Sequence, residues 1–454
     1  MFSNSQSKNP SLPFPSLVLY FQSNLKFGLS ELIYEFSNPS IDKRKRLKHT
    51  VNKTKEESTI EKKMNHKSKS IHDILPLDLI HIILLRVPIR HLACFRCVSK
   101  LWCSLISDPN FAELHLHLSL APTHGCLVRL NDSVEAYLIH LEEVFNGDNY
   151  QLMKEVSFPF KKQPPSGFCV MGSCRGFVLL SREPYFFVVW NPVTGFRKRI
   201  SYSCMFHRSK LRCLKFPRDA HLYGFGYDAS RDDYLFVVAS EDGGCQHLDC
   251  LCLRTNSWIS LDAALPKPLD FMKRRPPGLF LNDSIHWLCY SHKEQYSESI
   301  LTFDLKERSF SNISLPEQLR MHGRTTATIV TLGGYLALNY QDYVERKTHI
   351  WVMKEYKVHS SWTLYEIPCL EFEPLCLSNG SAIIALDPTT PVCEPLKFAK
   401  YNIREELLQY FTCPPHLGQE RYFFPSYTVY TESLLLFPND NNKHKNENKT
   451  NNFI

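Results

Sequence analysis

The stretch "ILPLDLIHIILLRVPIRHLACFRCVSKLW" (74–102) is the most apolar continuous piece of this 454-residue chain. Leu75-Pro76 is a natural helix start, because proline is tolerated in the first turn, where its missing N–H would have no partner. A helix is therefore expected from Leu77 until Pro88 ends it. Its only polar side chains are Asp78, His81 and Arg86. A surface helix normally shows one apolar stripe, whereas this segment is apolar almost all round.

Two more short helices are expected at 89–96 and 97–108, with Pro109 ending the last one. Three helices of this size cannot cover so many apolar side chains by packing on one another. The surplus predicts a surface that contacts the rest of the chain or a separate protein. A helical cap on the following domain is the alternative that periodicity leaves open.

From about residue 121 to 437 the sequence consists of short runs of β-branched and aromatic residues, broken by Gly, Pro, Asn and Asp. The best strand candidates are 176–180, 185–191, 234–240, 248–255, 284–290, 300–305, 335–340 and 348–356. Similar units begin near Gly172, Gly224, Leu281, Gly333 and Asn379, at spacings of 46 to 57 residues. Such a period with several strands per unit is typical of propeller blades.

A further unit is expected at 125–142, and "SYTVYTESLLLF" (426–437) is expected to close the ring by pairing with it. The predicted fold class is thus α+β multidomain, with a small three-helix domain (71–120) followed by an all-β, propeller-like domain (121–437) of six blades. A β-sandwich, or two small β domains, is the alternative.

The two ends of the chain are polar. Residues 1–70 hold 13 Lys and Arg against 6 Asp and Glu, so this extension accounts for the whole net charge of +7. We expect it, and the Asn-rich tail 438–454, to be disordered. The run "DKRKRLKH" (42–49) is either a nuclear-import signal or a solvated basic tail, and Met64 is a plausible alternative start. Because the remaining residues carry 40 charges of each sign, nucleic-acid binding by the body is not favoured.

Sixteen cysteines show no repeating framework, and the proline-interrupted N-terminal run "SLPFPSLVLYF" (11–21) lacks the basic start of a signal peptide. Neither this run nor the apolar stretch predicts a membrane span. A reducing compartment, the cytoplasm and/or the nucleus, is expected. Cys94 and Cys97 have the spacing of half a zinc site, but no second pair accompanies them, and no metal or other cofactor is expected. No phosphate-binding loop, nucleophile elbow or zinc-protease motif occurs, so the chain is not expected to be an enzyme.

The string "LPLDLIHIILLRVPIRHLACFRCVSKLWCSLISDPNFAELH" (75–115) strongly resembles the F-box. The later phrases "GSCRGFVLL" (172–180), "WNPVTGFRKRI" (190–200), "YGFGYDASRDDY" (223–234) and "LTFDLKERSFSNISLP" (301–316) resemble, in the same order, the F-box-associated domain of plant F-box proteins. "LGGY" (332–335) is kelch-like, but a Gly-Gly of this kind does not recur in each unit.

This resemblance implies a non-catalytic substrate receptor of an SCF-type cullin–RING ubiquitin ligase from a plant. The F-box would bind the Skp-type adaptor subunit, and the β domain would bind a target protein whose identity the sequence does not give. Residues at matching positions are expected in the adaptor interface or its immediate support: Leu75, Pro76, Leu79, Ile82, Leu92, Val98 and Trp102. An internal core role is the alternative for each of them.

Exposed loops between strands are expected to bind the target, and the residues proposed there are Tyr185, Phe206, His207, Arg274 and Arg275. Two other functions stay open at this stage. One is a β-propeller lectin or enzyme with a helical cap, which requires a polar, partly carboxylate-lined central pocket. The other is a nucleic-acid binder that uses the basic extension.

Overall fold

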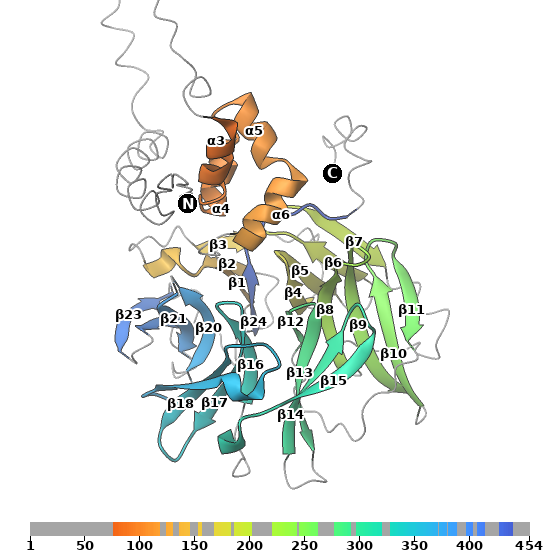
Figure 1. The fold of residues 1–454 in the computed structure, drawn as a ribbon, viewed down its shortest axis with the longest axis vertical. Helices are drawn as coiled ribbons and strands as arrows, with labels where there is room; N and C mark the ends of the chain where they lie inside the picture. The colour runs from red at the N-terminus through yellow and green to blue at the C-terminus, as the bar shows by residue number, and fades with distance from the viewer. Residues whose placement is uncertain are drawn as a thin grey trace, which may run out of the picture. The chain divides into compact units, whose positions relative to one another are not determined.

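The computed structural model describes residues 76–118, 124–129, 136–145, 153–156, 168–182, 186–201, 220–242, 245–261, 277–291, 297–319, 327–370, 372–378, 380–387, 396–402, 406–413 and 426–438. The chain divides into two compact units, 1–76 and 77–454. The second unit contains all of the described helices and strands (Figure 1). None of its described helices is long and apolar enough to cross a membrane.

The helical region contains four short helices, which are α3 (Leu77–Leu84), α4 (Ile89–Phe95), α5 (Lys100–Ile106) and α6 (Pro109–Leu118). Pro88 separates the first two helices, as expected, and the Ser99 hydroxyl caps α5 by accepting from the Trp102 backbone N–H at 3.1 Å. Pro109 was expected only to end the third helix. It also begins α6, since proline suits the first position of a helix.

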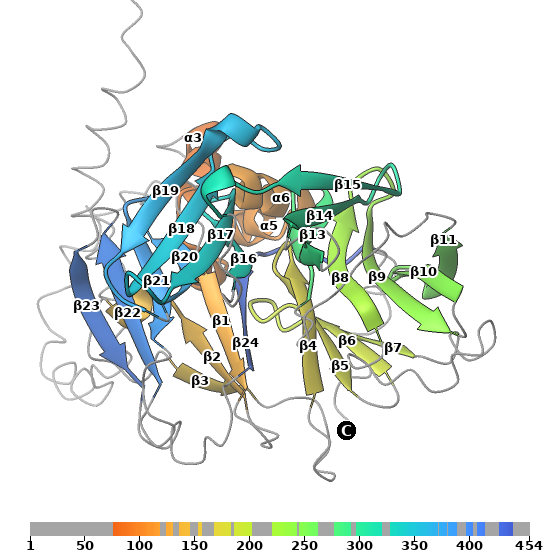
Figure 2. The same cartoon turned by 90° about the horizontal axis from the view of Figure 1, so that it is seen from below.

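The described strands form six separate four-stranded antiparallel sheets, which are the blades of a propeller (Figures 1 and 2). Blade one consists of β24 (Ser426–Thr431), β1 (His124–Arg129), β2 (Ala136–His140) and β3 (Met153–Val156). Blade two consists of β4 (Phe168–Cys174), β5 (Phe177–Arg182), β6 (Phe186–Trp190) and β7 (Arg197–Ser201). Blade three consists of β8 (Ala220–Asp228), β9 (Asp233–Asp242), β10 (Cys245–Cys252) and β11 (Ser257–Leu261).

Blade four consists of β12 (Leu279–Leu281), β13 (Ser284–Ser291), β14 (Ser297–Asp304) and β15 (Ser309–Ser314). Blade five consists of β16 (Ala327–Leu332), β17 (Tyr335–Asp342), β18 (Lys347–Met353) and β19 (Trp362–Ile367). Blade six consists of β20 (Glu373–Ser378), β21 (Ala382–Asp387), β22 (Lys397–Asn402) and β23 (Leu407–Thr412). The predicted fold class and number of blades are confirmed.

The ring closes through the C-terminal strand. β24 pairs with β1 antiparallel, from His124↔Thr431 to Arg129↔Ser426, so the first blade combines both ends of the domain. This is the closure that the sequence predicted for 426–437. The segment after β24 continues inward, because Leu435 and Phe437 are buried in the cluster that blades two and three share.

The core is a series of apolar layers between neighbouring blades rather than one central mass. Buried clusters fill each of the six interfaces around the ring, including the one between blades six and one. Each sheet has two apolar faces and buries both against its neighbours, which explains the continuous apolar runs of strands such as β6, where every residue is buried. The eight strands proposed from the sequence all lie in these sheets. The repeat units proposed from the sequence do not coincide with the blades. Most of the proposed units begin at or near the turn after a blade's first strand, so they are shifted by about one strand.

Candidate protein-docking surface on the helices

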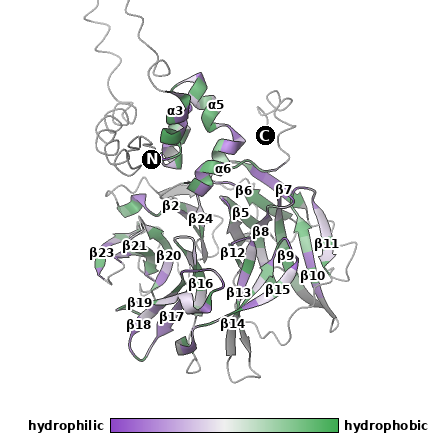
Figure 3. Ribbon diagram, viewed as in Figure 1, coloured by the Kyte–Doolittle hydropathy of each residue, from purple (hydrophilic) through white to green (hydrophobic). Residues whose placement is uncertain are grey.

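Helix α3 has apolar side chains on both of its sides. Ile80 and Leu84 are buried, one turn apart, and form its inner stripe. Leu79 and Ile82 lie on the opposite side and are each 44% exposed, whereas Leu77, in the first turn of the same stripe as Ile80 and Leu84, is 51% exposed. In Figure 3 the helix is mainly green, with purple, hydrophilic parts between the apolar ones. Leu77, Leu79 and Ile82 thus leave about half of their apolar side-chain surface open to solvent.

The turn between α4 and α5 also presents an apolar side chain to solvent. Val98 lies in this turn and is 50% exposed, whereas Leu92 of α4 is fully buried. Trp102 is half-buried and meets Phe95 edge-to-face, with ring centroids 5.4 Å apart. The indole N–H of Trp102 is shielded from solvent and has no hydrogen-bond partner among the described residues.

The structure thus separates the residues proposed for the adaptor interface into two kinds. Leu79, Ile82 and Val98 are exposed, as is Pro76 just before α3, whereas Leu92 is buried and Trp102 has an intermediate exposure. Leu75 lies outside the described residues, and its role stays a prediction, as do the roles of the others. Sequence reasoning did not select Leu77, although the same apolar run contains it. We name the exposed set Leu77, Leu79, Ile82 and Val98 the helical docking surface.

Helix α6 connects the helical region to the propeller. Its Ala112 and Leu116 pack against the apolar cluster of blades two and three. Glu113 of α6 forms an ion pair with Arg175, whose guanidinium also lies 4.2 Å from the ring centroid of Tyr227. On its other side α6 contacts the first helices, because His115 Nε2 lies 2.9 Å from the Val87 carbonyl oxygen. Burial lowers the pKa of His115, which favours its neutral form.

The residues proposed to contact the target are not positioned by the structure. Tyr185, Phe206, His207, Arg274 and Arg275 all lie outside the described residues. Their roles stay predictions.

Metal-ligating side chains gather at two places in the described residues, and neither involves Cys94 or Cys97. At the first, His124 Nδ1 lies 2.9 Å from Glu142, and Cys376 lies beside them with its thiol pKa raised well above the ordinary value by burial. At the second, Asp342 accepts a backbone N–H, Glu345 pairs with Lys347, and His349 lies 3.5 Å from Glu366. Existing hydrogen bonds and ion pairs account for most of these groups.

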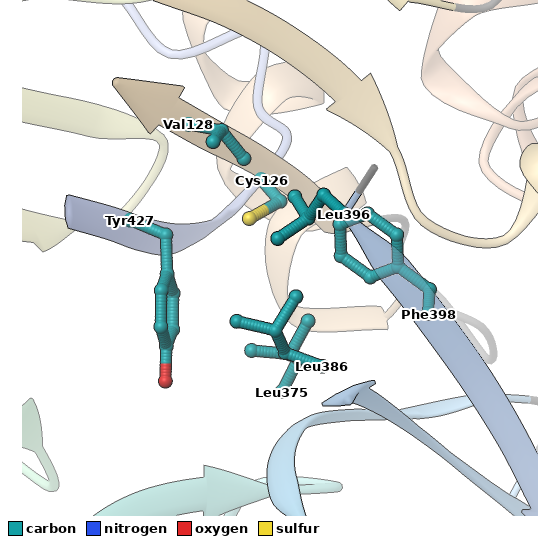
Figure 4. A pocket seen from close by; sticks show the side chains of 7 residues that line it. All are labelled: Cys126, Val128, Leu375, Leu386, Leu396, Phe398 and Tyr427. Carbon is teal, nitrogen blue, oxygen red and sulfur yellow. The ribbon is translucent and has the colours of Figure 1, made fainter. Parts of the chain in front are cut away.

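A small pocket lies between blades one and six. Its lining is apolar apart from one phenol: Cys126, Val128, Leu375, Leu386, Leu396, Phe398 and Tyr427 (Figure 4). The Tyr427 hydroxyl donates to Glu373 at 2.6 Å. This lining lacks the carboxylate-rich character that a glycan site or a hydrolytic site needs, so it gives the lectin or enzyme alternative no support.

Comparison with known proteins identifies two domains in the chain. Residues 73–114 match the F-box domain, and residues 129–436 match the F-box associated beta propeller domain. The F-box protein CPR1 of Arabidopsis thaliana is 29% identical over 317 residues, which cover 64% of this chain and 71% of that protein. An F-box/kelch-repeat protein of the same plant is 26% identical over 325 residues, covering 68% of this chain and 84% of its own.

Among solved structures, the β-propeller domain of the Trilobed protease from Pyrococcus furiosus matches with a TM-score of 0.30 and 12% identity, over 53% of this chain and 70% of that one. The family match is the stronger finding. This chain belongs to the F-box proteins that carry an F-box associated β-propeller domain. The pairing of these two domains supports an F-box substrate adaptor.

Proposed function

We propose that this protein is the substrate receptor of an SCF-type cullin–RING ubiquitin ligase. The F-box binds a Skp-type adaptor, the propeller binds a target protein, and the other subunits supply the chemistry of ubiquitination that leads to proteasomal degradation. The protein itself acts without catalysing a reaction. The observation that carries this proposal is the helical docking surface, whose four apolar side chains are 44–51% exposed although the adjoining core is well packed.

Burying such side chains in a partner removes apolar surface from water, which is the main driving force of most protein associations. Trp102 adds a half-buried aromatic side chain next to this surface, and binding energy concentrates in such residues. We place the protein in the cytoplasm and/or the nucleus. The twelve cysteines whose side chains are described are all free, which fits a reducing compartment.

The test is co-purification of the full chain with a recombinant Skp-type adaptor. The double variant Leu79→Asp, Ile82→Asp puts two charges into the docking surface and should weaken adaptor binding at least about a hundredfold, because a buried unpaired charge costs several kcal/mol. Leu118→Asp is the matched control, since Leu118 is also an exposed leucine, at 56% against 44% for Leu79, but lies at the end of α6. This control should bind like the wild type. Unchanged binding of the double variant would show that the surface is wrongly assigned, and no binding by the wild type would refute the proposed function.

A second double variant, Leu75→Ala with Pro76→Ala, tests the helix start in the same assay. It removes side chains without adding charge, so a smaller loss of affinity, about tenfold, is expected.

A further inference from the structure

The antiparallel blades give the propeller two distinct ends. In blades two to six the turns after the first and third strands lie at one end of the sheet, and the turn after the second strand lies at the other. Neighbouring first strands run in the same direction, as the parallel bridge between Gly224 and Gly278 shows for blades three and four. The turns of one kind therefore share one end of the ring.

Helix α6 contacts the end with the first and third turns, which we name the near end. Its partner Arg175 lies in the β4–β5 turn, and Tyr227 and Leu253 of the shared cluster border the β8–β9 and β10–β11 turns. The opposite end, named the far end, carries the turns after the second strands. If the helices dock on the ligase, the far end is the one that faces away from them.

One far-end turn is fully described, and its chemistry differs from that of the near-end turns. The β17–β18 turn carries Tyr343, which is 49% exposed, and Val344, which at 93% is the most exposed large hydrophobic residue in the described part of the chain. The near-end turns present mainly glycine or polar residues, such as Asn282-Asp283 and Gly333-Gly334.

The backbone holds this tip in one conformation. Asp342 Oδ1 accepts the backbone N–H groups of Val344 at 2.8 Å and of Glu345 at 2.9 Å, and Arg346 has a left-handed φ of 58°. Lys347 lies 3.3 Å from Glu345 and 3.1 Å from Glu366, so the two carboxylates share one ammonium group. Arg346 remains exposed, and no described residue forms an ion pair with it.

We propose that the tip of this hairpin, Tyr343, Val344 and Arg346, is a contact surface for the target protein, which offers an apolar pocket beside a carboxylate. Tyrosine and arginine are enriched among residues that dominate interface energies, and a preformed turn loses little conformational entropy on binding. Arg346 is the cation of the tip that forms no ion pair with a described residue, so its guanidinium is the group that can bind a carboxylate of the partner. This inference rests on the proposed function and adds the place and chemistry of target binding.

The same blade supplies matched controls at its near end. Tyr335 directly follows the β16–β17 turn and is 42% exposed, and Val358 lies between β18 and β19 and is 39% exposed. Each control thus has the residue type of its partner at the tip but lies at the other end of the sheet.

The experiment uses the full chain in complex with the adaptor. A photoreactive phenylalanine analogue replaces Tyr343 in one sample and Tyr335 in the other, and both samples are irradiated in plant extract with proteasome and ligase activity blocked. A protein that crosslinks only from position 343 is then purified, and its affinity for the full chain is measured directly. We expect Val344→Asp and Arg346→Glu to weaken this affinity at least tenfold, and Val358→Asp and Tyr335→Ala to leave it unchanged.

Equal affinities of Val344→Asp and the wild type would overturn the inference, and so would equal crosslinking from both positions or none from position 343. Adaptor binding is measured on every variant and should not change. A wild-type chain that does not bind the adaptor would instead refute the proposed function. Failure of the inference and failure of the proposed function are therefore distinguishable.

Discussion

At the scale of single residues, His286 makes the stability of the propeller depend on pH. The ring is fully buried on β13, with Nδ1 3.1 Å from the Leu279 carbonyl oxygen and Nε2 2.8 Å from the Tyr356 hydroxyl. A neutral imidazole satisfies both, since it donates from Nδ1 and accepts at Nε2. Burial lowers the pKa of His286 to about 4 from its ordinary 6.5.

Because the folded pKa is depressed, the unfolded chain binds more protons than the folded chain between pH 6.5 and pH 4. The contribution of His286 to the free energy of unfolding is therefore complete above pH 6.5. It falls on acidification by about 1.4 kcal/mol per pH unit within the window.

The variant His286→Gln tests this contribution by urea unfolding between pH 7.5 and pH 5. It should be less stable than the wild type at pH 7.5, and the difference should shrink by about 1–2 kcal/mol at pH 5. His117→Gln is the control, because that side chain is 63% exposed on α6 and its contact with Glu113, at 3.7 Å, is a surface pair worth less than about 1 kcal/mol, so its difference from the wild type should change little. A constant gap for His286→Gln across this range contradicts the assignment.

At the scale of elements, two turns that contain glycine allow the cost of backbone strain to be measured apart from the cost of steric overlap. Gly176 and Gly334 both follow the first strand of a blade and have nearly the same φ, +85° and +83°. A Cβ at Gly334 meets nothing within 4 Å, whereas one at Gly176 would overlap Ser433, whose backbone nitrogen lies 3.1 Å away. The β4–β5 turn is thus packed directly against the segment after β24.

We expect Gly334→Ala to cost about 1–2 kcal/mol from the left-handed backbone alone. Gly176→Ala should cost about 1–3 kcal/mol more, because the C-terminal segment must shift. Adding Ser433→Gly to Gly176→Ala should recover part of this difference, although it removes the hydrogen bond from Ser433 Oγ to the Arg175 carbonyl oxygen. Thermal and urea unfolding measure all three, and equal costs for the two alanine variants would show that the overlap has no effect.

Elements with a strong local signal could be predicted from the sequence. Strands such as β9 and β13 contain runs rich in apolar and aromatic residues, which are buried between two blades, and this burial is what made the runs conspicuous. β12 has only three residues and β16 has mixed exposure, so these first strands gave little signal and shifted the proposed units. The new helix at Pro109 was missed because proline both ends and begins helices.

The candidate site was predictable to a similar degree. The excess of apolar residues in α3 indicated a docking surface, but periodicity does not determine which side faces the core, and it left Leu77 unselected. Contacts over long sequence distances gave no local signal at all. The pair between Glu113 and Arg175 and the exposure of Val344 follow from the assembled ring.

At the scale of the whole molecule, the propeller depends on residues near the end of the chain. β24 is the first strand of blade one, so without it β1 loses one of its two partners. The same segment contributes Tyr430 to the cluster between blades one and two, and Leu435 and Phe437 to the cluster between blades two and three. Phe437 also stacks on Phe196 and Tyr234, at centroid distances of 5.5 Å and 5.4 Å.

Deleting residues 426–454 should therefore prevent formation of the closed ring. Losing three large buried side chains, at about 2–5 kcal/mol each, approaches the whole stability of a typical domain. Deleting only residues 439–454 is the control, because it leaves every contact just named intact, and this variant should unfold like the full chain. Limited proteolysis and thermal unfolding distinguish the two. Phe437→Ala keeps β24 and removes its anchor, so it should lower stability by about 3–5 kcal/mol without opening the ring. A 426–454 deletion that stays protease-resistant would show that five and three-quarter blades suffice, and that β24 is dispensable for closure.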